Sequence, residues 1–501
     1  MAEYDPGSLR AAALRGTLWS AVQQIGNKGL LLPLYLVLAR LLPVESFGLV
    51  ALAAAYIDFV MLFLHQGLTA AIVQREDLER EHLDSAFWGN IGFALLLAGF
   101  GVASAETFAR LAGRPELASI VRWLSIAFLL SGLISVQDAI LRRGLRFKAL
   151  AIRAVVGQAT AGTIGIVLAF SGYGVWSLVA MQLINQALGC VLLWRASDWR
   201  PRMRFSFRRY LELLAFGVNI LGLNLIRFAR VRADNFLIGF ALGTIPLGYY
   251  TIARQLTNGL SVLVTGSIAP VLWSTLPRLQ RQPERMARAI YQGAEMLALM
   301  TWPAYFGLAA VAALMVPLFL GDEWLPSIPI LVAFSLAAAT HSITGLNFSA
   351  LLAIGETGWR VRIEILSTVV SLLAMIVALP GGIVAVAWAY AGALYLLLPV
   401  QVGLAVRLLP IELRPYLRRY RIPAGGSVLM LAAVLIARPW AVAGLAAPAA
   451  LATLILLGAF VFAGFVWLTA PDLARRAAGN LRLALSRGGE DDTREIESLT
   501  S

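Results

Sequence analysis

Seven basic residues lie inside stretches of the chain that are otherwise apolar. They are Lys28, Arg122, Arg153, Arg227, Arg230, Arg232 and Arg254. A charge at the centre of a membrane costs at least ~2.5–3.5 kcal/mol on insertion scales, so it is expected to face a partner or a wet cavity. Guanidinium groups match phosphate and pyrophosphate, and amide side chains suit sugar hydroxyls. The pattern therefore predicts a cationic, amide-rich cavity for an anionic, hydroxylated ligand.

The densest part of this pattern is the segment NILGLNLIRFARVRADNFLIG, residues 219–239. On a helix Arg227 and Arg230 share a face, whereas Arg232 lies about 160° around from Arg230. Arg230 and Asp234 are four residues apart, so this spacing predicts an ion pair between them. The candidate substrate-binding residues are Lys28, Arg227, Arg230, Arg254, Gln24, Asn27, Asn224 and Asn258.

An alternative for some of these arginines is a position near the membrane surface, where the side chain reaches lipid phosphate. We predict this for Arg153 and predict cavity lining for Lys28, Arg230 and Arg254. Three acidic residues in apolar stretches could couple transport to protons or sodium, or could simply pair with arginines. These are Asp58, Asp234 and Glu295.

Other kinds of chemistry are disfavoured. The single cysteine, Cys190, excludes an intramolecular disulfide framework, and the three histidines are too scattered for a metal site. The sequence has no GxxxxGK[ST] phosphate loop and no HExxH motif. We therefore expect no catalytic residue, no metal and no cofactor.

The elements that position the candidate residues are predicted to be membrane-spanning helices. Apolar residues make up 59% of the 501 residues and charged residues only 14%, against roughly 45–50% and 25% in soluble proteins. The fold class predicted is an all-α polytopic membrane protein. Pro303 and Pro317 predict a kink or an early end in the ninth span. The spans are expected near 17–39, 46–70, 84–105, 117–140, 149–170, 174–194, 211–238, 246–270, 287–320, 327–353, 361–379, 382–406, 424–441 and 448–470.

The basic residues between these spans predict the orientation. With the N-terminus in the cytoplasm, thirty of the 41 basic residues fall on the cytoplasmic side and four on the other. This is the asymmetry of the positive-inside rule for fourteen spans with both termini cytoplasmic. The net charge of +13 is then a topology signal, with membrane lipids as partners and no nucleic acid expected.

A weak internal repeat appears at an offset of 200 residues. LARLLPVESFGLVALA (38–53) aligns with IGFALGTIPLGYYTIA (238–253), so that Gly48 meets Gly248. Duplicated halves are common in transporters. The domains predicted are a six-helix lobe at 1–200, a second at 201–410, two added helices at 411–475 and a polar cytoplasmic tail at 476–501.

Several blocks of sequence resemble the bacterial polysaccharide transporters known as Wzx-type oligosaccharide flippases. They include LVLARLLPVESFGLVALA, QGLTAAIVQ, LDSAFWGNI, AILRRGLRFKALA, GYGVWSLVAMQL, FLIGFALGTIPLGYYTIARQL and LGDEWLPSIPILVAFS. Within this family, the sequence is most similar to the exopolysaccharide and colanic-acid subgroup. The resemblance implies the multidrug/oligosaccharidyl-lipid/polysaccharide (MOP) exporter superfamily, with two six-helix lobes around a central cavity and alternating access.

The cargo implied is an undecaprenyl-pyrophosphate-linked oligosaccharide, such as an O-antigen, capsule or exopolysaccharide repeat unit. It would move from the cytoplasmic to the periplasmic leaflet of a bacterial inner membrane, with the polymerase and glycosyltransferases of the same pathway as candidate partners. Two alternatives remain open. One is a cation-coupled multidrug exporter of the same superfamily, and the other is a membrane polysaccharide polymerase or ligase, which the short external loops disfavour.

Overall fold

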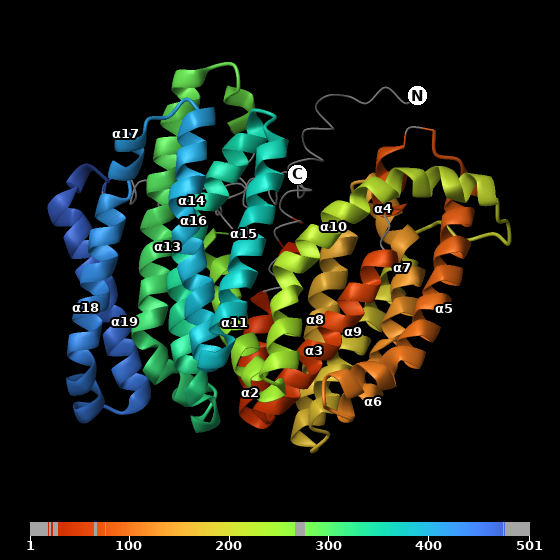
Figure 1. Ribbon diagram of the computed structural model, residues 1–501, viewed down its shortest axis with the longest axis horizontal. Coiled ribbons are helices and arrows are strands. Elements are labelled where there is room, and N and C mark those ends of the chain that lie inside the picture. Colours follow the sequence, from red (N-terminus) through yellow and green to blue (C-terminus); the bar gives the residue numbers. More distant parts are fainter. Residues whose placement is uncertain are drawn as a thin grey trace, which may run out of the picture. The chain divides into compact units, whose positions relative to one another are not determined.

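The structure is a computed structural model that describes residues 19, 22–23, 29–64, 68–75, 77–265, 276–473 and 475. Within these residues every element is a helix (Figure 1). The helices are α2 Leu31–Leu41, α3 Val44–Leu64, α4 Leu68–Gln74, α5 Arg80–Leu111, α6 Glu116–Leu124, α7 Ile126–Arg143, α8 Phe147–Phe170, α9 Val175–Ala196, α10 Phe207–Ala241, α11 Thr244–Thr265, η2 Leu276–Leu279, α13 Pro283–Phe319, η3 Asp322–Ser327, α14 Ile328–Ala353, α15 Thr357–Ala378, η4 Leu379–Gly381, α16 Gly382–Leu408, α17 Leu413–Arg418, α18 Arg421–Gly444 and α19 Ala447–Thr469.

Many of these helices have the length and composition of membrane spans. Among the described residues, ten helical segments are long and apolar enough to cross a membrane. One of them, Thr357–Leu408, contains both α15 and α16, while α2 is apolar but only 11 residues long. The predicted all-α membrane class is confirmed for this part of the chain. The number of fourteen spans stays a prediction.

Helix α13 runs through both of its prolines. The expectation of an early end at Pro303 is wrong, because the helix continues unbroken to Phe319. Thr301 and Tyr305 on either side of Pro303 are buried. Packing of this kind, rather than propensity, keeps most helices helical, so the missing N–H of the proline does not end the element.

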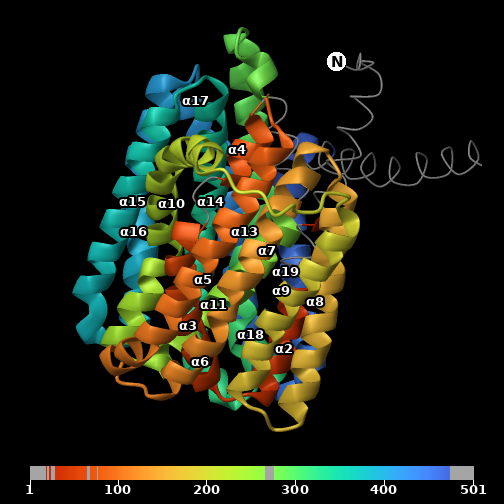
Figure 2. The same cartoon turned by 90° about the vertical axis from the view of Figure 1, so that its right-hand side faces the viewer.

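The chain forms two compact units. The first contains residues 1–263, 319–331 and 364–393, and the second contains residues 264–318, 332–363 and 394–501. In the first unit α8 and α9 lie side by side, joined by a turn in which Gly172 and Gly174 adopt φ values of 81° and 54° (Figures 1 and 2). Glycine adopts such values without a steric penalty. The predicted six-helix lobes stay a prediction.

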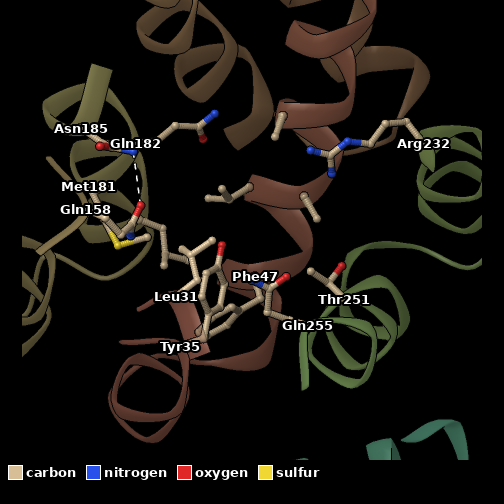
Figure 3. A pocket seen from close by; sticks show the side chains of 14 residues that line it. Leu31, Tyr35, Phe47, Gln158, Met181, Gln182, Asn185, Arg232, Thr251 and Gln255 are labelled. Carbon is tan, nitrogen blue, oxygen red and sulfur yellow. Dashed lines mark hydrogen bonds between the residues drawn. The ribbon is translucent and has the colours of Figure 1, made fainter. Parts of the chain in front are cut away.

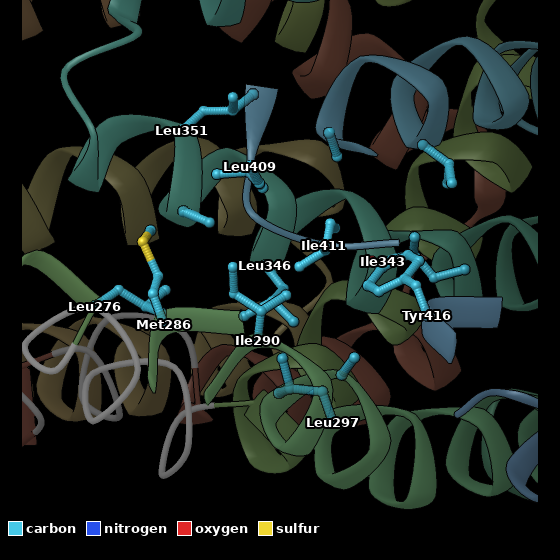
Figure 4. Packing of buried hydrophobic residues seen from close by; sticks show 14 of the residues in the cluster. Leu276, Met286, Ile290, Leu297, Ile343, Leu346, Leu351, Leu409, Ile411 and Tyr416 are labelled. Carbon is cyan, nitrogen blue, oxygen red and sulfur yellow. The ribbon is translucent and has the colours of Figure 1, made fainter. Parts of the chain in front are cut away.

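The second unit has its own apolar core. Met286, Ile290 and Leu297 of α13 pack with Leu346 of α14 and Leu409 at the end of α16 (Figure 4). All five side chains are buried. Lipid is as apolar as these residues, so close packing rather than water exclusion stabilises such contacts within the membrane.

In the first unit the two segments of the predicted repeat meet. A side-chain carbon at Gly48 would overlap the carbonyl oxygen of Thr244, and one at Gly248 would overlap the carbonyl oxygen of Val44. Val44 and Thr244 are themselves equivalent positions of the repeat. The starts of α3 and α11 therefore cross through matching residues, and glycine at both positions permits the approach of the two backbones.

Candidate functional site

The candidate cations lie on α10 and α11 of the first unit. Figure 1 shows α10 changing direction partway along, so that its second half, with Arg227, Arg230 and Arg232, runs beside α3. A turn at Gly243, with φ at 95°, then leads into α11 and Arg254. These two helices bring four of the seven intramembrane basic residues into one part of the chain.

Asp234 is the centre of a buried polar cluster. Only 5% of the residue is exposed, and its Oδ2 accepts a hydrogen bond of 2.8 Å from the Tyr250 hydroxyl. Arg254 forms an ion pair with the same carboxylate oxygen and donates from Nη2 to the Tyr250 hydroxyl at 2.7 Å. The Arg254 guanidinium also lies over the Tyr250 ring, 4.7 Å from its centroid. The three groups form one hydrogen-bonded cluster whose charges balance.

The predicted pair between Arg230 and Asp234 is wrong. Arg230 instead pairs with Glu364 of α15, at 2.8 Å between Nε and Oε1. The reason is that Asp234 is buried toward Tyr250 and Arg254, whereas about half of the Arg230 side chain is exposed. Four-residue spacing permits a pair along one helix, but the partners on neighbouring helices have the better geometry here.

Each acidic residue proposed for ion coupling has an arginine partner. Asp58 of α3 pairs with Arg232 at 2.6 Å, and Asp234 pairs with Arg254. Glu295 of α13 pairs with Arg419 at 3.1 Å, within the second unit. The observed pairs agree with the structural role left open in the sequence analysis, and they leave the coupling role a prediction.

The other candidate residues lie in different surroundings. Arg227 and Asn258 are exposed, and Arg227 makes no ion pair with any residue in the described ranges. Asn224 lines a separate cavity of ≈ 440 Å³ together with Asn90 and Ser135. The predicted residues Gln24, Asn27 and Lys28 lie outside the described residues.

Two further intramembrane arginines lie away from α10 and α11. Arg122 pairs with Glu106 at 2.8 Å, where both side chains are largely exposed. Arg153 of α8 lies against Gly189 of α9, where an added side-chain carbon would come within 2.8 Å of its Nε. The Arg153 guanidinium therefore lies against protein, and its predicted contact with lipid phosphate stays a prediction.

The start of α10 is fixed by a charged cluster before its apolar part. The N-cap Ser206 accepts from the backbone N–H of Arg209, whose side chain pairs with Glu79 at 2.9 Å. Arg75 donates to Glu212 at 2.8 Å. His82 Nε2 lies 3.4 Å from the same carboxylate oxygen. The cluster ties α10 to the start of α5.

The pairing changes what the arginines can do. Arg230, Arg232 and Arg254 are each balanced by a carboxylate, so the described site is less positive than a count of arginines suggests. A guanidinium has five N–H donors in a planar fork, and a carboxylate occupies at most two of them in a bidentate pair. Arg230 and Arg232 therefore keep donors that suit a phosphate oxygen, whereas Arg254 also donates to the Tyr250 hydroxyl and to the carbonyl of Val231.

A second cavity of the first unit, of ≈ 320 Å³, contains residues that were not predicted (Figure 3). Amides from α8 and α9 line one side of it: Gln158, Gln182 and Asn185. Asn185 Nδ2 donates to Gln158 Oε1 at 3.3 Å. A usable signal existed in the sequence, since Gln182 and Asn185 are three residues apart in an apolar span and so share a helical face.

The described residues contain no group of three or more His, Cys, Asp or Glu side chains that could hold a metal ion. The polar groups of the α10–α11 region and of the ≈ 320 Å³ cavity are arginine–carboxylate pairs, amides and hydroxyls. Such groups bind ligands by hydrogen bonds and charge.

Comparison with known proteins gives a consistent result. Residues 37–329 match the family described as polysaccharide biosynthesis protein. The succinoglycan biosynthesis transport protein ExoT of Rhizobium meliloti (strain 1021) is 28% identical over 323 residues, which cover 64% of this chain and 65% of ExoT. The match thus spans slightly less than two thirds of the length of ExoT. The lipopolysaccharide biosynthesis protein WzxC of Escherichia coli (strain K12) is 22% identical over 372 residues, or 74% of this chain and 76% of WzxC.

Solved structures show a similar fold. The lipid II flippase MurJ, in an inward closed conformation, superimposes with a TM-score of 0.71 at 14% identity, covering 91% of this chain and 99% of MurJ. An inward-facing multidrug resistance MATE family transporter of the MOP superfamily gives a TM-score of 0.56 at 18% identity, covering 78% and 94%. At these identities the likeness concerns the fold alone.

Proposed function

Because the chain belongs to the polysaccharide biosynthesis protein family, we propose that it is a flippase for a lipid-linked oligosaccharide. The resemblance found in the sequence is confirmed by this match and by the relatives ExoT and WzxC. The chain is a multi-pass bacterial membrane protein. The proposed cargo is an undecaprenyl-pyrophosphate-linked repeat unit, moved from the cytoplasmic to the periplasmic leaflet of the inner membrane.

The proposed topology has fourteen spans and two cytoplasmic termini. Separating α15 from α16 and adding α2, α10 and α11 to the ten candidate segments accounts for these spans. The distribution of basic residues between them supports the orientation. The six-helix lobes at 1–200 and 201–410 remain part of the proposal.

One observation carries the proposed function: α10 and α11 hold arginines within otherwise apolar sequence, and carboxylates on other helices or on α10 pair with those arginines. Arg230 and Arg254 are the examples with the clearest partners. A pyrophosphate brings more negative charge than a single carboxylate and matches the guanidinium fork. It can therefore bind the donors that Arg230 does not use for Glu364, or replace the carboxylate partner of either arginine.

Exchange of partners gives a physical route for release. When the pyrophosphate leaves, the carboxylate returns to its arginine, so no cation is left buried without a partner, which would be costly. We propose that this exchange accompanies alternating access, in which the site opens first to the cytoplasm and then to the periplasm. The sugars would cross in water while the polyprenyl chain stays in lipid.

The alternatives are less well supported. A cation-coupled drug exporter shares the fold but not the family, and the fold likeness to a MATE transporter does not favour it over the polysaccharide relatives. ExoT is named a transport protein, which supports a transporter rather than a polymerase or ligase. Polymerase and glycosyltransferases of the same pathway are proposed as partners of the chain.

The test is polymer export in a deletion strain that carries variants of the protein. Arg230→Ala should abolish export at unchanged membrane abundance, because the pyrophosphate loses a forked ligand. Arg122→Ala is the matched control, since Arg122 also forms a 2.8 Å pair but lies away from α10 and α11. Normal export from Arg230→Ala, or equal loss from both variants, would contradict the proposed role.

A further inference from the structure

The lining of the ≈ 320 Å³ cavity in the first unit comes from α2, α3, α8, α9, α10 and α11, whereas the proposed pyrophosphate site uses only α10 and α11. Its polar lining comes from Gln158 of α8, Gln182 and Asn185 of α9, and Thr251 and Gln255 of α11. Figure 3 shows Gln182 and the guanidinium of Arg232 pointing into the same space from opposite sides. A volume of this size falls within the range of small-molecule sites.

One polar atom of this lining is buried without a partner. Thr251 Oγ1 is inaccessible and makes no hydrogen bond with any residue in the part of the chain that the structure describes. A buried hydroxyl without a partner costs about 1–3 kcal/mol, so such groups generally have a ligand or an ordered water. Thr251 lines the cavity, as do the amides, but its hydroxyl oxygen has no accessible surface and is not counted among the ligands.

The cavity carries no net charge among its described residues. Arg232 is its one charged lining residue, and Asp58 balances it at 2.6 Å. Amide groups offer both donors and acceptors, as sugar hydroxyls do. A neutral, hydroxyl-rich group would therefore find complementary partners in these amides.

The remaining walls are apolar. The ring centroids of Tyr35 and Phe47 lie 6.0 Å apart on one side of the space. The other apolar lining residues are Leu31, Val50, Ala51, Ala54, Leu178 and Met181. Apolar walls with a few convergent polar groups are typical of small-ligand sites. A sugar ring has this same division between polar edge and apolar face.

We propose that this cavity binds one neutral sugar unit of the carried oligosaccharide, with Gln158, Gln182, Asn185 and Gln255 as ligands to its hydroxyls. The inference rests on the proposed flippase function and adds to it the recognition of the glycan. Gln255 follows Arg254 directly in α11, and Arg232 follows Arg230 by two residues in α10. The sugar subsite and the proposed pyrophosphate ligands therefore share two helices, α10 and α11.

The experiment compares a lipid pyrophosphate with and without a sugar. Geranylgeranyl pyrophosphate and the same lipid bearing glucose or galactose are titrated into the purified full-length protein by calorimetry. Wild type should bind at least one sugar-bearing probe more tightly than the bare lipid. In the double variant Gln182→Leu, Gln255→Leu this advantage should fall by about tenfold, since each amide contributes a net hydrogen bond. Affinity for the bare lipid should stay unchanged.

The control is Thr160→Val, which removes a hydroxyl from the exposed face of α8. It should leave both affinities unchanged. Gln182 has no hydrogen-bond partner among the described residues, so its replacement breaks no described contact. Loss of affinity for both probes in the double variant, or no advantage of either sugar in wild type, overturns the sugar subsite. Failure of wild type to bind even the bare lipid overturns the pyrophosphate site itself.

Discussion

The Arg254–Asp234 pair allows stability and transport to be separated. Replacing Arg254 by leucine leaves a carboxylate that is only 6% exposed, with the Tyr250 hydroxyl and the Asn235 backbone N–H as its remaining donors. Breaking a buried pair from one side costs about 3–5 kcal/mol, because the other charge stays buried without a partner. The single variant Arg254→Leu should therefore lower the unfolding free energy by about that amount.

The double variant Arg254→Leu, Asp234→Asn removes both charges together. Replacing a buried pair by neutral groups is often nearly neutral in stability, so most of the loss should be recovered. Transport should not recover, because the proposed pyrophosphate ligand is still absent. If Arg254 were only a structural partner of Asp234, the double variant would export polymer normally.

The assay uses the single cysteine of the chain. Cys190 is partly buried, and a thiol-reactive dye added during heating of the purified protein reports unfolding at this position. Polymer export is measured in a deletion strain with equal membrane abundance of each variant. A double variant as unstable as the single one would refute the charge-balance reasoning, and an exporting double variant would refute the role of Arg254 in binding.

The remaining predictions concern the helix crossing, the start of α10 and the edge of the second cavity. Gly48→Leu should prevent accumulation of folded protein, because the carbonyl group of Thr244 in α11 occupies the space that the new side chain needs. Gly99→Leu should be tolerated, because no atom lies within 4 Å of an added side-chain carbon there. Equal abundance of the two variants would contradict the crossing. Glu212→Gln removes the charge that pairs with Arg75, so tryptic cleavage at the start of α10 should be faster than in wild type, and unchanged cleavage would contradict the tether. Asp58→Asn should lower the unfolding free energy by less than about 1 kcal/mol, because both side chains of its pair with Arg232 are more than a third exposed. A loss of several kcal/mol, measured by thermal unfolding, would contradict this prediction.

The helices followed from the sequence because each is encoded by its own continuous apolar stretch. The predicted span 149–170, for example, is α8, Phe147–Phe170. The repeat also aligned Gly48 with Gly248, although it did not predict that the two segments would meet. These features depend on local composition or on direct comparison of two segments.

The pairing of charges could not be predicted in the same way. Arg230 meets Glu364 of α15, a partner that only the packing of distant helices supplies. Likewise, Gln158 and Asn185 form one hydrogen-bonded pair across α8 and α9, which the sequence of neither span reveals. Helical periodicity gives the faces of single helices but not which faces meet.

The most direct test of the proposed function is translocation in proteoliposomes. The lipid-linked oligosaccharide that accumulates in a deletion strain is labelled fluorescently, incorporated in both leaflets, and exposed to a quencher that cannot cross the membrane. In vesicles with the wild-type protein nearly all fluorescence should be quenched, because inner-leaflet lipid reaches the outer leaflet. In vesicles with Arg254→Leu, Asp234→Asn about half should stay protected, and the same protected half in wild-type vesicles would contradict flippase activity.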